Sequence, residues 1–283
     1  IPPSIVLIIL GDVFRVPVGD LFSAAVWPGL GLVAAYIIFI LIVSYFKKDM
    51  APAIPKDPSR GSKMKQVIKA LIDIIPSLTL ILFVLGSIFA GIATPTESSA
   101  IGCLGAVLLA VAYRSFSTDM VKEAAFESVK VTSMVFAILI GATAFSMVFT
   151  YTGGDEIVET FMKNLPGDEK FAFILFTMLA IFLLGFFIDF VEISYIIVPI
   201  LVPIAMNLDI NPVWFAILIA MNLQTSFLTP PFGFALFYLK GVVSSCIRTI
   251  DIYKGVLPFI LIQIIVLLLL VFFPDFFGIK ASL

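Results

Sequence analysis

The stretch "NLQTSFLTPPFGFALFYLKGV", residues 222–242, interrupts a chain that otherwise reads as membrane-spanning helix. Its two adjacent prolines donate no backbone hydrogen bond, and an unpaired backbone group costs several kcal/mol in hydrocarbon. Asn, Gln, Thr and Ser gather directly before the prolines. This pattern predicts a functional site at the break Thr229–Gly233. The simpler alternative is a proline kink that serves only packing.

The composition bounds the class of protein. The 283 residues are 61% hydrophobic and 13% charged, with a mean hydropathy of +1.18. Several apolar stretches reach the roughly 20 residues that span a bilayer, which predicts a polytopic helical membrane protein. The chain has no histidine, which excludes histidine metal sites and Ser-His-Asp catalysis. Cys103 lies in an apolar helix and Cys246 in a basic loop, so no disulfide is expected.

Seven apolar segments alternate with polar ones. They fall at about 28–46, 71–93, 98–113, 131–150, 171–206, 213–239 and 255–273. The segment 47–70 carries seven Lys/Arg against two Asp and is expected to be a cytoplasmic loop. In that orientation thirteen of the 17 Lys/Arg lie on the cytoplasmic side. The acidic segment from Tyr151 to Lys170 is expected outside, as a solvated loop.

Segment 171–206 is too long for one crossing, and Asp189 and Glu192 lie near its middle. It is either two full crossings or a re-entrant hairpin that enters from outside and turns within the membrane. The acidic centre has no Lys or Arg nearby, as a cytoplasmic turn usually would. This favours the hairpin.

The opening of the chain repeats its end. A Pro-Pro pair, a Gly, an Asp and a Pro recur in the same order about 230 residues apart. The pairs after the prolines are Gly11 with Gly241, Asp20 with Asp251, and Pro28 with Pro258. Residues 1–46 then form the tail of a first repeat and 71–283 a second one. The chain opens at Ile1 without Met or a signal peptide pattern, so we expect it to continue a longer protein.

Each repeat has five net crossings, so consecutive copies are inverted in the membrane. Inverted repeats with proline-interrupted helices at matching positions are typical of secondary transporters, with the site near the midplane. The predicted fold is therefore an all-α polytopic membrane protein with inverted repeats, a re-entrant hairpin and broken helices.

Four motifs together resemble the large membrane subunit of TRAP (tripartite ATP-independent periplasmic) transporters. They are "IPPS" (1–4), "GIATPTESSAIG" (91–102), "GFFIDFVEISYIIVPILVPI" (185–204) and "NLQTSFLTPPFG" (222–233). The resemblance covers the whole chain, except that the early helices and hairpin of the first repeat are missing.

The resemblance implies an elevator-type importer of the ion-transporter superfamily in the bacterial inner membrane. A sodium gradient would drive uptake of an organic acid, such as a sialic acid or a dicarboxylate. A periplasmic binding protein (P subunit) would deliver it, and a small membrane subunit (Q) would assist. No cofactor other than the coupling sodium ion and no nucleic acid is expected. The alternatives are an anion transporter without binding protein, or an intramembrane enzyme or scaffold subunit.

Helix ends created by a break bind ions, because carbonyl ends favour cations and N-terminal ends favour anions. The predicted sodium ligands are Gly185, Asp189, Thr229, Pro230, Pro231 and Gly233, with Pro2, Pro3 and Ser4 from the other broken helix. The predicted substrate contacts are Asp189, Glu192, Ser194, Asn222 and Thr225. An acid within the membrane is costly and points to function. The structural alternative is that Asp189 caps a helix whose N3 residue is Glu192.

The motif "TPTE", residues 94–97, predicts a structural cap. Thr94 fits the N-cap, Pro95 the first helical position and Glu97 the N3 position of a capping box. It is expected to close a tight turn between two helices.

Overall fold

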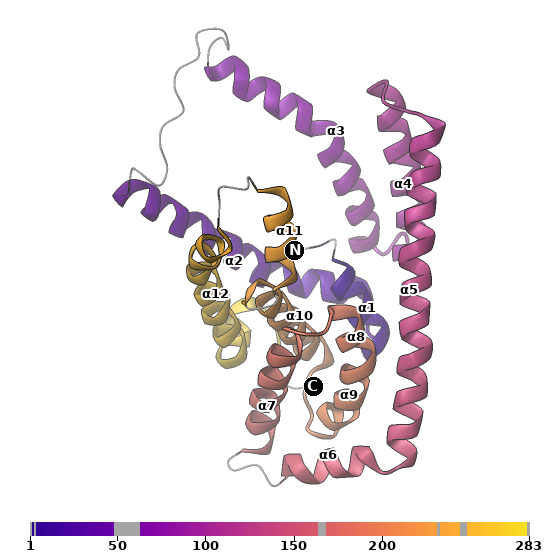
Figure 1. Cartoon of the computed structure of the whole chain (residues 1–283), viewed down its shortest axis with the longest axis vertical. Helices are drawn as coiled ribbons and strands as arrows, with labels where there is room; N and C mark the ends of the chain where they lie inside the picture. Colours follow the sequence, from indigo (N-terminus) through magenta and orange to yellow (C-terminus); the bar gives the residue numbers. More distant parts are fainter. Residues whose placement is uncertain are drawn as a thin grey trace. The chain divides into compact units, whose positions relative to one another are not determined.

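The chain folds into a series of helices (Figure 1). The computed structural model describes residues 2, 4–47, 63–163, 168–230, 233–243 and 248–281, and no strand occurs within these ranges. Two compact units result: residues 1–36 with 131–283, and residues 37–130.

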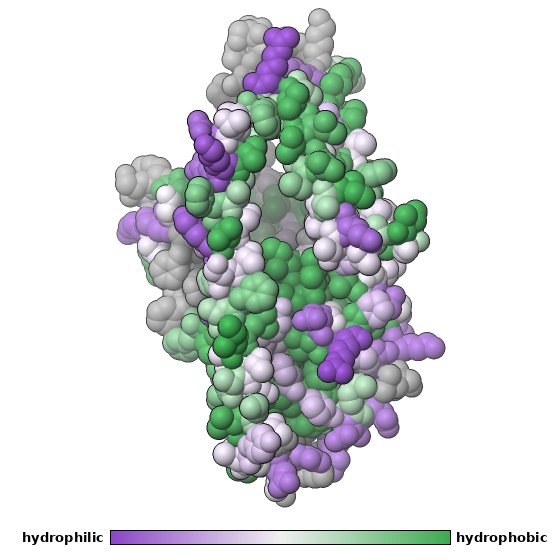
Figure 2. Space-filling model, turned by 90° about the vertical axis from the view of Figure 1, so that its right-hand side faces the viewer, coloured by the Kyte–Doolittle hydropathy of each residue, from purple (hydrophilic) through white to green (hydrophobic). Residues whose placement is uncertain are grey.

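Within the residues that the structure describes, six helices are long and apolar enough to cross a membrane. They are α2 (Val18–Phe46), α3 (Lys63–Phe89), α4 (Pro95–Ala112), α5 (Thr118–Tyr151), the run Phe190–Asn207, and α12 (Thr249–Phe272). Their large apolar side chains are widely exposed, and hydrophobic residues cover much of the face seen in Figure 2. The protein is therefore an all-α polytopic membrane protein, as predicted.

Several helices begin before the apolar segment that predicted them. α2 begins at Val18 instead of 28, and α5 at Thr118 instead of 131. The last residues of the predicted loop 47–70 belong to α3, which begins at Lys63. Hydropathy detects only the apolar part of a helix, whereas Lys, Met, Gln and Glu continue a helix readily into polar surroundings.

The acidic segment after Tyr151 is a helix where a solvated loop was predicted. α6 covers Gly154–Lys163, and α7 follows at Glu169. Apolar residues alternate with acids at helical spacing in "GDEIVETFMK", so the segment is amphipathic. This helix was not predicted, because the segment is rich in acids and glycine.

In the smaller unit, α3 and α4 pack as an antiparallel pair. The Ser87 and Ser98 hydroxyl oxygens lie 2.8 Å apart across the two helices. Thr94 and Glu97 form a complete capping box at the start of α4. The Thr94 backbone N–H donates to Glu97 Oε2 at 2.8 Å, and the Glu97 N–H donates to Thr94 Oγ1 at 3.3 Å, with Pro95 in the first turn. This cap closes the tight turn between the helices.

In the larger unit, α10 (Pro212–Leu228) is the central helix (Figure 1). It packs against α1 (Ile5–Phe14), α7 (Glu169–Leu184) and α12. Phe215, near its start, contacts Phe14 of α1 and Phe173 of α7, with ring centroids 5.7 and 5.6 Å apart. The indole N–H of Trp214 donates to the Leu270 carbonyl of α12 at 3.0 Å. Apolar burial from three sides keeps α10 in place.

Candidate functional site

Segment 171–206 forms an antiparallel helical hairpin. Its first arm is α7, and its second is α8 (Phe190–Glu192), a π-helical turn (Ile193–Ile197) and α9 (Val198–Asn207). At the open end, Lys170 Nζ donates to the Asp209 carbonyl at 2.9 Å. At the closed end, Phe190 contacts Phe227 of α10, with centroids 5.9 Å apart. The hairpin tip, residues 185–189, therefore lies near the C-terminal end of α10.

Gly185 brings the hairpin tip into direct contact with α10. A β-carbon built on Gly185 would lie 2.8 Å from Cβ of Ser226 and would also overlap its hydroxyl. Only glycine permits this approach, because any side chain would push the two helices apart. The Ser226 hydroxyl itself donates to the Leu223 carbonyl at 2.8 Å.

Asn222 and Thr225, two predicted substrate residues, are buried in α10 and already engaged there. The Asn222 side-chain amide donates to the Met178 carbonyl of α7 at 2.6 Å. The Thr225 hydroxyl donates to the Met221 carbonyl of its own helix at 2.8 Å. The Asn222 contact holds the first arm of the hairpin on α10. The role of both residues toward a substrate stays a prediction.

Asp189, Glu192 and Ser194 lie at the start of the second arm. Asp189 occupies the N-cap position of α8, yet its side chain makes no capping hydrogen bond. Glu192 Oε2 and the Ser194 hydroxyl are buried, and within the described part of the chain neither has a hydrogen-bond partner. The capping alternative thus accounts for the place of Asp189 in the helix, but its carboxylate makes no capping hydrogen bond.

The break in the central helix separates α10 from α11 (Phe234–Val242). Thr229 ends α10, and its hydroxyl donates to the Thr225 carbonyl at 2.8 Å. The Gly233 N–H donates to the Thr229 carbonyl at 3.2 Å, and a β-carbon there would lie 2.6 Å from the Phe227 carbonyl oxygen. Pro230 lies within this turn; Pro231 lies outside the described residues.

Ser4 brings a further helix terminus to the same place. It is the N-cap of α1, and its hydroxyl accepts a hydrogen bond of 3.5 Å from the Leu7 N–H. Ser4 lines one pocket with Phe227 and Leu228 at the end of α10. Pro2 lies two residues before it and is buried, whereas Pro3 lies outside the described residues.

Three of the described helix N-termini therefore lie close to the C-terminus of α10 in the larger unit. The N-termini are those of α1, α8 and α11, and the C-terminus is that of α10. N-termini carry partial positive charge and C-termini partial negative charge. The arrangement offers carbonyl oxygens and a carboxylate to a cation, and backbone N–H groups to an anion.

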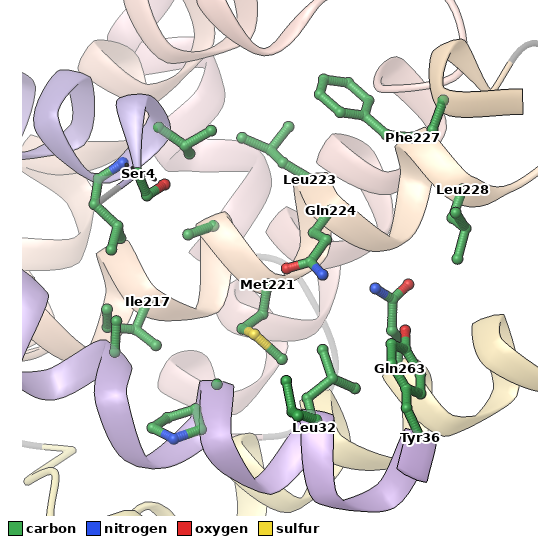
Figure 3. A pocket seen from close by; sticks show the side chains of 18 residues that line it. Ser4, Leu32, Tyr36, Ile217, Met221, Leu223, Gln224, Phe227, Leu228 and Gln263 are labelled. Carbon is green, nitrogen blue, oxygen red and sulfur yellow. Dashed lines mark hydrogen bonds between the residues drawn. The ribbon is translucent and has the colours of Figure 1, made fainter. Parts of the chain in front are cut away.

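Sequence patterns marked Ser226 as part of the polar cluster but missed its contact with Gly185. They also missed Gln263 and Tyr36, which place buried polar atoms without described partners beside α10 (Figure 3). Gln263 had a visible signal, because it is a lone amide within the apolar run "FILIQIIVLLLLVF". The contact of Ser226 with Gly185 had none, because it depends on how two helices pack.

The proteins to which this chain is similar are components of bacterial transporters. The chain is 32% identical to the sialic acid TRAP transporter large permease protein SiaM of Vibrio cholerae, over 98% of this chain and 62% of that protein. It is 29% identical to the C4-dicarboxylate TRAP transporter large permease protein DctM of Pseudomonas aeruginosa, over 97% and 62%. It is 28% identical to the isethionate TRAP transporter permease protein DctMQ of Oleidesulfovibrio alaskensis, over 97% and 42%.

The chain thus spans less than two thirds of the length of these relatives. A family model described as "Tripartite ATP-independent periplasmic transporter, DctM component" matches residues 1–276. This match confirms the resemblance seen in the four motifs. The chain therefore belongs to the family of the DctM component of tripartite ATP-independent periplasmic transporters.

Proposed function

We propose that the chain forms the core of a sodium-driven importer of an organic acid that works by an elevator mechanism. A periplasmic binding protein delivers the acid, and a small membrane subunit assists in the bacterial inner membrane. Membership of a transporter family agrees with the prediction of a transport component and not an enzyme. The observation that carries the proposal is the Asp189 carboxylate, which makes no capping hydrogen bond and lies at a hairpin tip beside the break in α10–α11.

The charged groups of the site support a function in which a cation and an anionic substrate bind together. An ionised carboxylate left alone at mid-membrane costs roughly 2.5–3.5 kcal/mol on insertion scales. A sodium ion between Asp189 and the C-terminal carbonyls of α10 would offset this cost. The N-termini of α1 and α11 remain for the carboxylate of the substrate.

The length of the first arm supports a hairpin that turns within the membrane. α7 has 16 residues, about 24 Å at 1.5 Å per residue, against a hydrocarbon core about 30 Å thick. The tip contacts α10 at the break, and α11 continues for 9 residues beyond it. If each arm crossed the whole membrane, the hairpin tip and the break beside it would lie at a membrane surface. α11, which continues beyond the break, would then lie outside the membrane.

The named relatives support the class of substrate. Sialic acid, C4-dicarboxylates and isethionate are all anions that carry a carboxylate or sulfonate group. An anion held by helix N-termini fits this chemistry. We therefore propose a small organic acid for this chain as well.

Uptake in proteoliposomes tests the proposal. The full-length chain is reconstituted with its small subunit and binding protein, and an inward sodium gradient is imposed. We expect uptake to require sodium and to stop when choline replaces sodium at fixed pH and membrane potential. Equal uptake in choline would show that transport does not depend on sodium. Uptake without any binding protein would show that transport does not require the tripartite assembly.

A further inference from the structure

In the smaller unit, the first residues of α3 project beyond the helix against which α3 packs. Three close approaches fix the register of the antiparallel pair: Ser87 with Ser98, Val84 with Gly102, and Leu80 with Gly105. As α4 advances by one residue, α3 recedes by one, so the end of α4 at Ala112 lies level with Asp73. Residues 63–72, the projecting segment, therefore extend about 15 Å past the end of α4.

The projecting segment has an apolar face and a basic face. Its apolar residues recur at the spacing of one helix face, and all are exposed: Met64, Val67, Ile68, Leu71 and Ile72. By their spacing, the lysines at positions 63, 65 and 69 fall outside this apolar stripe, and no acid occurs among residues 63–72. An amphipathic helix with lysines on its polar face is typical of segments that lie in a membrane interface.

The length of α3 places the projecting segment at the membrane surface. α3 has 27 residues, about 40 Å at 1.5 Å per residue, whereas the hydrocarbon core is about 30 Å thick. The excess of about 10 Å falls at the basic end, because the opposite end, up to Phe89, is apolar. Pro76 lies between the projecting segment and the part that packs on α4, and α3 is bent in Figure 1. Proline removes a backbone hydrogen bond, so the segment can tilt toward the membrane plane.

The charge around the projecting segment favours anionic headgroups. Residues 47–69 carry seven Lys/Arg against two Asp. Basic clusters directly beside a transmembrane helix attract anionic lipids, and each Lys or Arg near the surface strengthens binding about fivefold. Residues 114–130, also expected on the cytoplasmic side, carry three Lys/Arg against three acids, and Lys130 forms an ion pair with Glu127. The excess of positive charge is therefore a property of the α3 end and not of this whole side.

We propose that the projecting segment binds anionic phospholipid in the cytoplasmic leaflet. Its apolar stripe inserts at the boundary between headgroups and acyl chains, and its lysines bind the negatively charged headgroups. Lipid is favoured over a protein partner, because the segment continues a membrane-spanning helix and so reaches the headgroups by itself. The contact anchors the smaller unit at the membrane surface. It is a surface separate from the candidate transport site.

Fluorescent labels on single cysteines test the proposal in the full-length chain. In a background without Cys103 and Cys246, Met64→Cys or Val67→Cys places the label on the apolar stripe. Ala70→Cys is the matched control, because its spacing puts it on the other side of the helix. The protein is held in nanodiscs of phosphatidylcholine with increasing phosphatidylglycerol, and quenching by acrylamide in the water is measured. We expect phosphatidylglycerol to protect the labels on the stripe and to leave the label at position 70 exposed.

Charge variants test whether the lysines are responsible. The lysine variant replaces the three basic residues of the projecting segment: Lys63→Gln, Lys65→Gln and Lys69→Gln. Glutamine is a good helix former, so the helix should persist. Binding should weaken by roughly 100-fold, so that protection is lost over the whole range of phosphatidylglycerol. The control variant removes three positive charges from residues 114–130 and should keep the protection: Arg114→Gln, Lys122→Gln and Lys130→Gln.

The outcomes are distinct. Loss of protection in the lysine variant alone, and weaker protection in about 1 M salt, support the proposal. Equal protection in pure phosphatidylcholine, equal loss in both charge variants, or equal exposure at positions 64 and 70 at every lipid composition overturns it. Protection that appears only when the small membrane subunit is added also overturns it, because the stripe then binds a protein. No uptake is measured, so the result is independent of the proposed transport reaction.

Discussion

We expect Asp189→Asn to lower the initial rate of the proposed organic-acid uptake by roughly 10- to 100-fold, while the protein still inserts and folds. Hydrogen bonds to charged groups contribute about 1.5–3 kcal/mol, and each 1.4 kcal/mol corresponds to about tenfold in binding. Asn caps helices about as well as Asp, and the Asp189 side chain makes no capping hydrogen bond. The substitution therefore removes the charge alone. The measurement is initial uptake at matched abundance in the membrane.

The matched control is Asp209→Asn. Asp209 follows α9 at the open end of the hairpin, far along the helices from the tip, and its backbone carbonyl accepts the hydrogen bond from Lys170. Its φ of 51° is a left-handed conformation that Asn tolerates well. Uptake should stay at the wild-type rate. Wild-type uptake by Asp189→Asn as well would reduce Asp189 to a structural residue.

Gly185→Ala should cost about 1–3 kcal/mol of stability and most of the uptake, because the new methyl group overpacks the hairpin tip. Its β-carbon would meet Ser226 Cβ at 2.8 Å, and Cβ cannot rotate away as a hydroxyl can. The tip must then move off α10 and away from the break. Thermal unfolding in detergent measures the loss of stability. The initial rate of uptake measures how the displaced hairpin tip affects transport.

The partner substitution separates this clash from a general effect of alanine. Ser226→Gly removes the side-chain atoms that the new methyl group at position 185 would meet, so the double variant should recover part of the uptake. Ser226→Ala keeps Cβ and should not rescue it. Gly141→Ala in α5 is the neutral control, because nothing beyond its chain neighbours and its own helix backbone lies within 4 Å of its new β-carbon. Equal losses for Gly185→Ala and Gly141→Ala would contradict the packing of the tip.

Sequence patterns predicted the helical class, the break at Thr229–Gly233 and the cap at Thr94, because each has a local cause. Proline, glycine and capping residues act on the backbone within a few positions of themselves. The helix starts at Val18, Lys63 and Thr118 were missed, because hydropathy marks the apolar part of a helix and not its polar extension. α6 was missed because its acids outweighed its helical spacing.

The candidate site was predictable only where chemistry alone marks a residue. Asp189 stands out as an acid in an apolar segment, and its place beside the break follows from the hairpin. The hydrogen bond from Asn222 to Met178 and the contact of Gly185 with Ser226 depend on which faces of α7 and α10 meet. No single sequence carries that information, because many rotations of two apolar helices bury similar area.

Sodium-dependent stability of the purified full-length protein tests the central claim, that Asp189 and the helix break hold the coupling ion together. A ligand that binds only the folded state raises the free energy of unfolding by RT ln(1 + [L]/Kd). We predict that sodium chloride raises the Tm of the wild type and of Asp209→Asn above that in choline chloride of equal concentration. Asp189→Asn should lose this difference. A full sodium-dependent shift in Asp189→Asn would contradict the account.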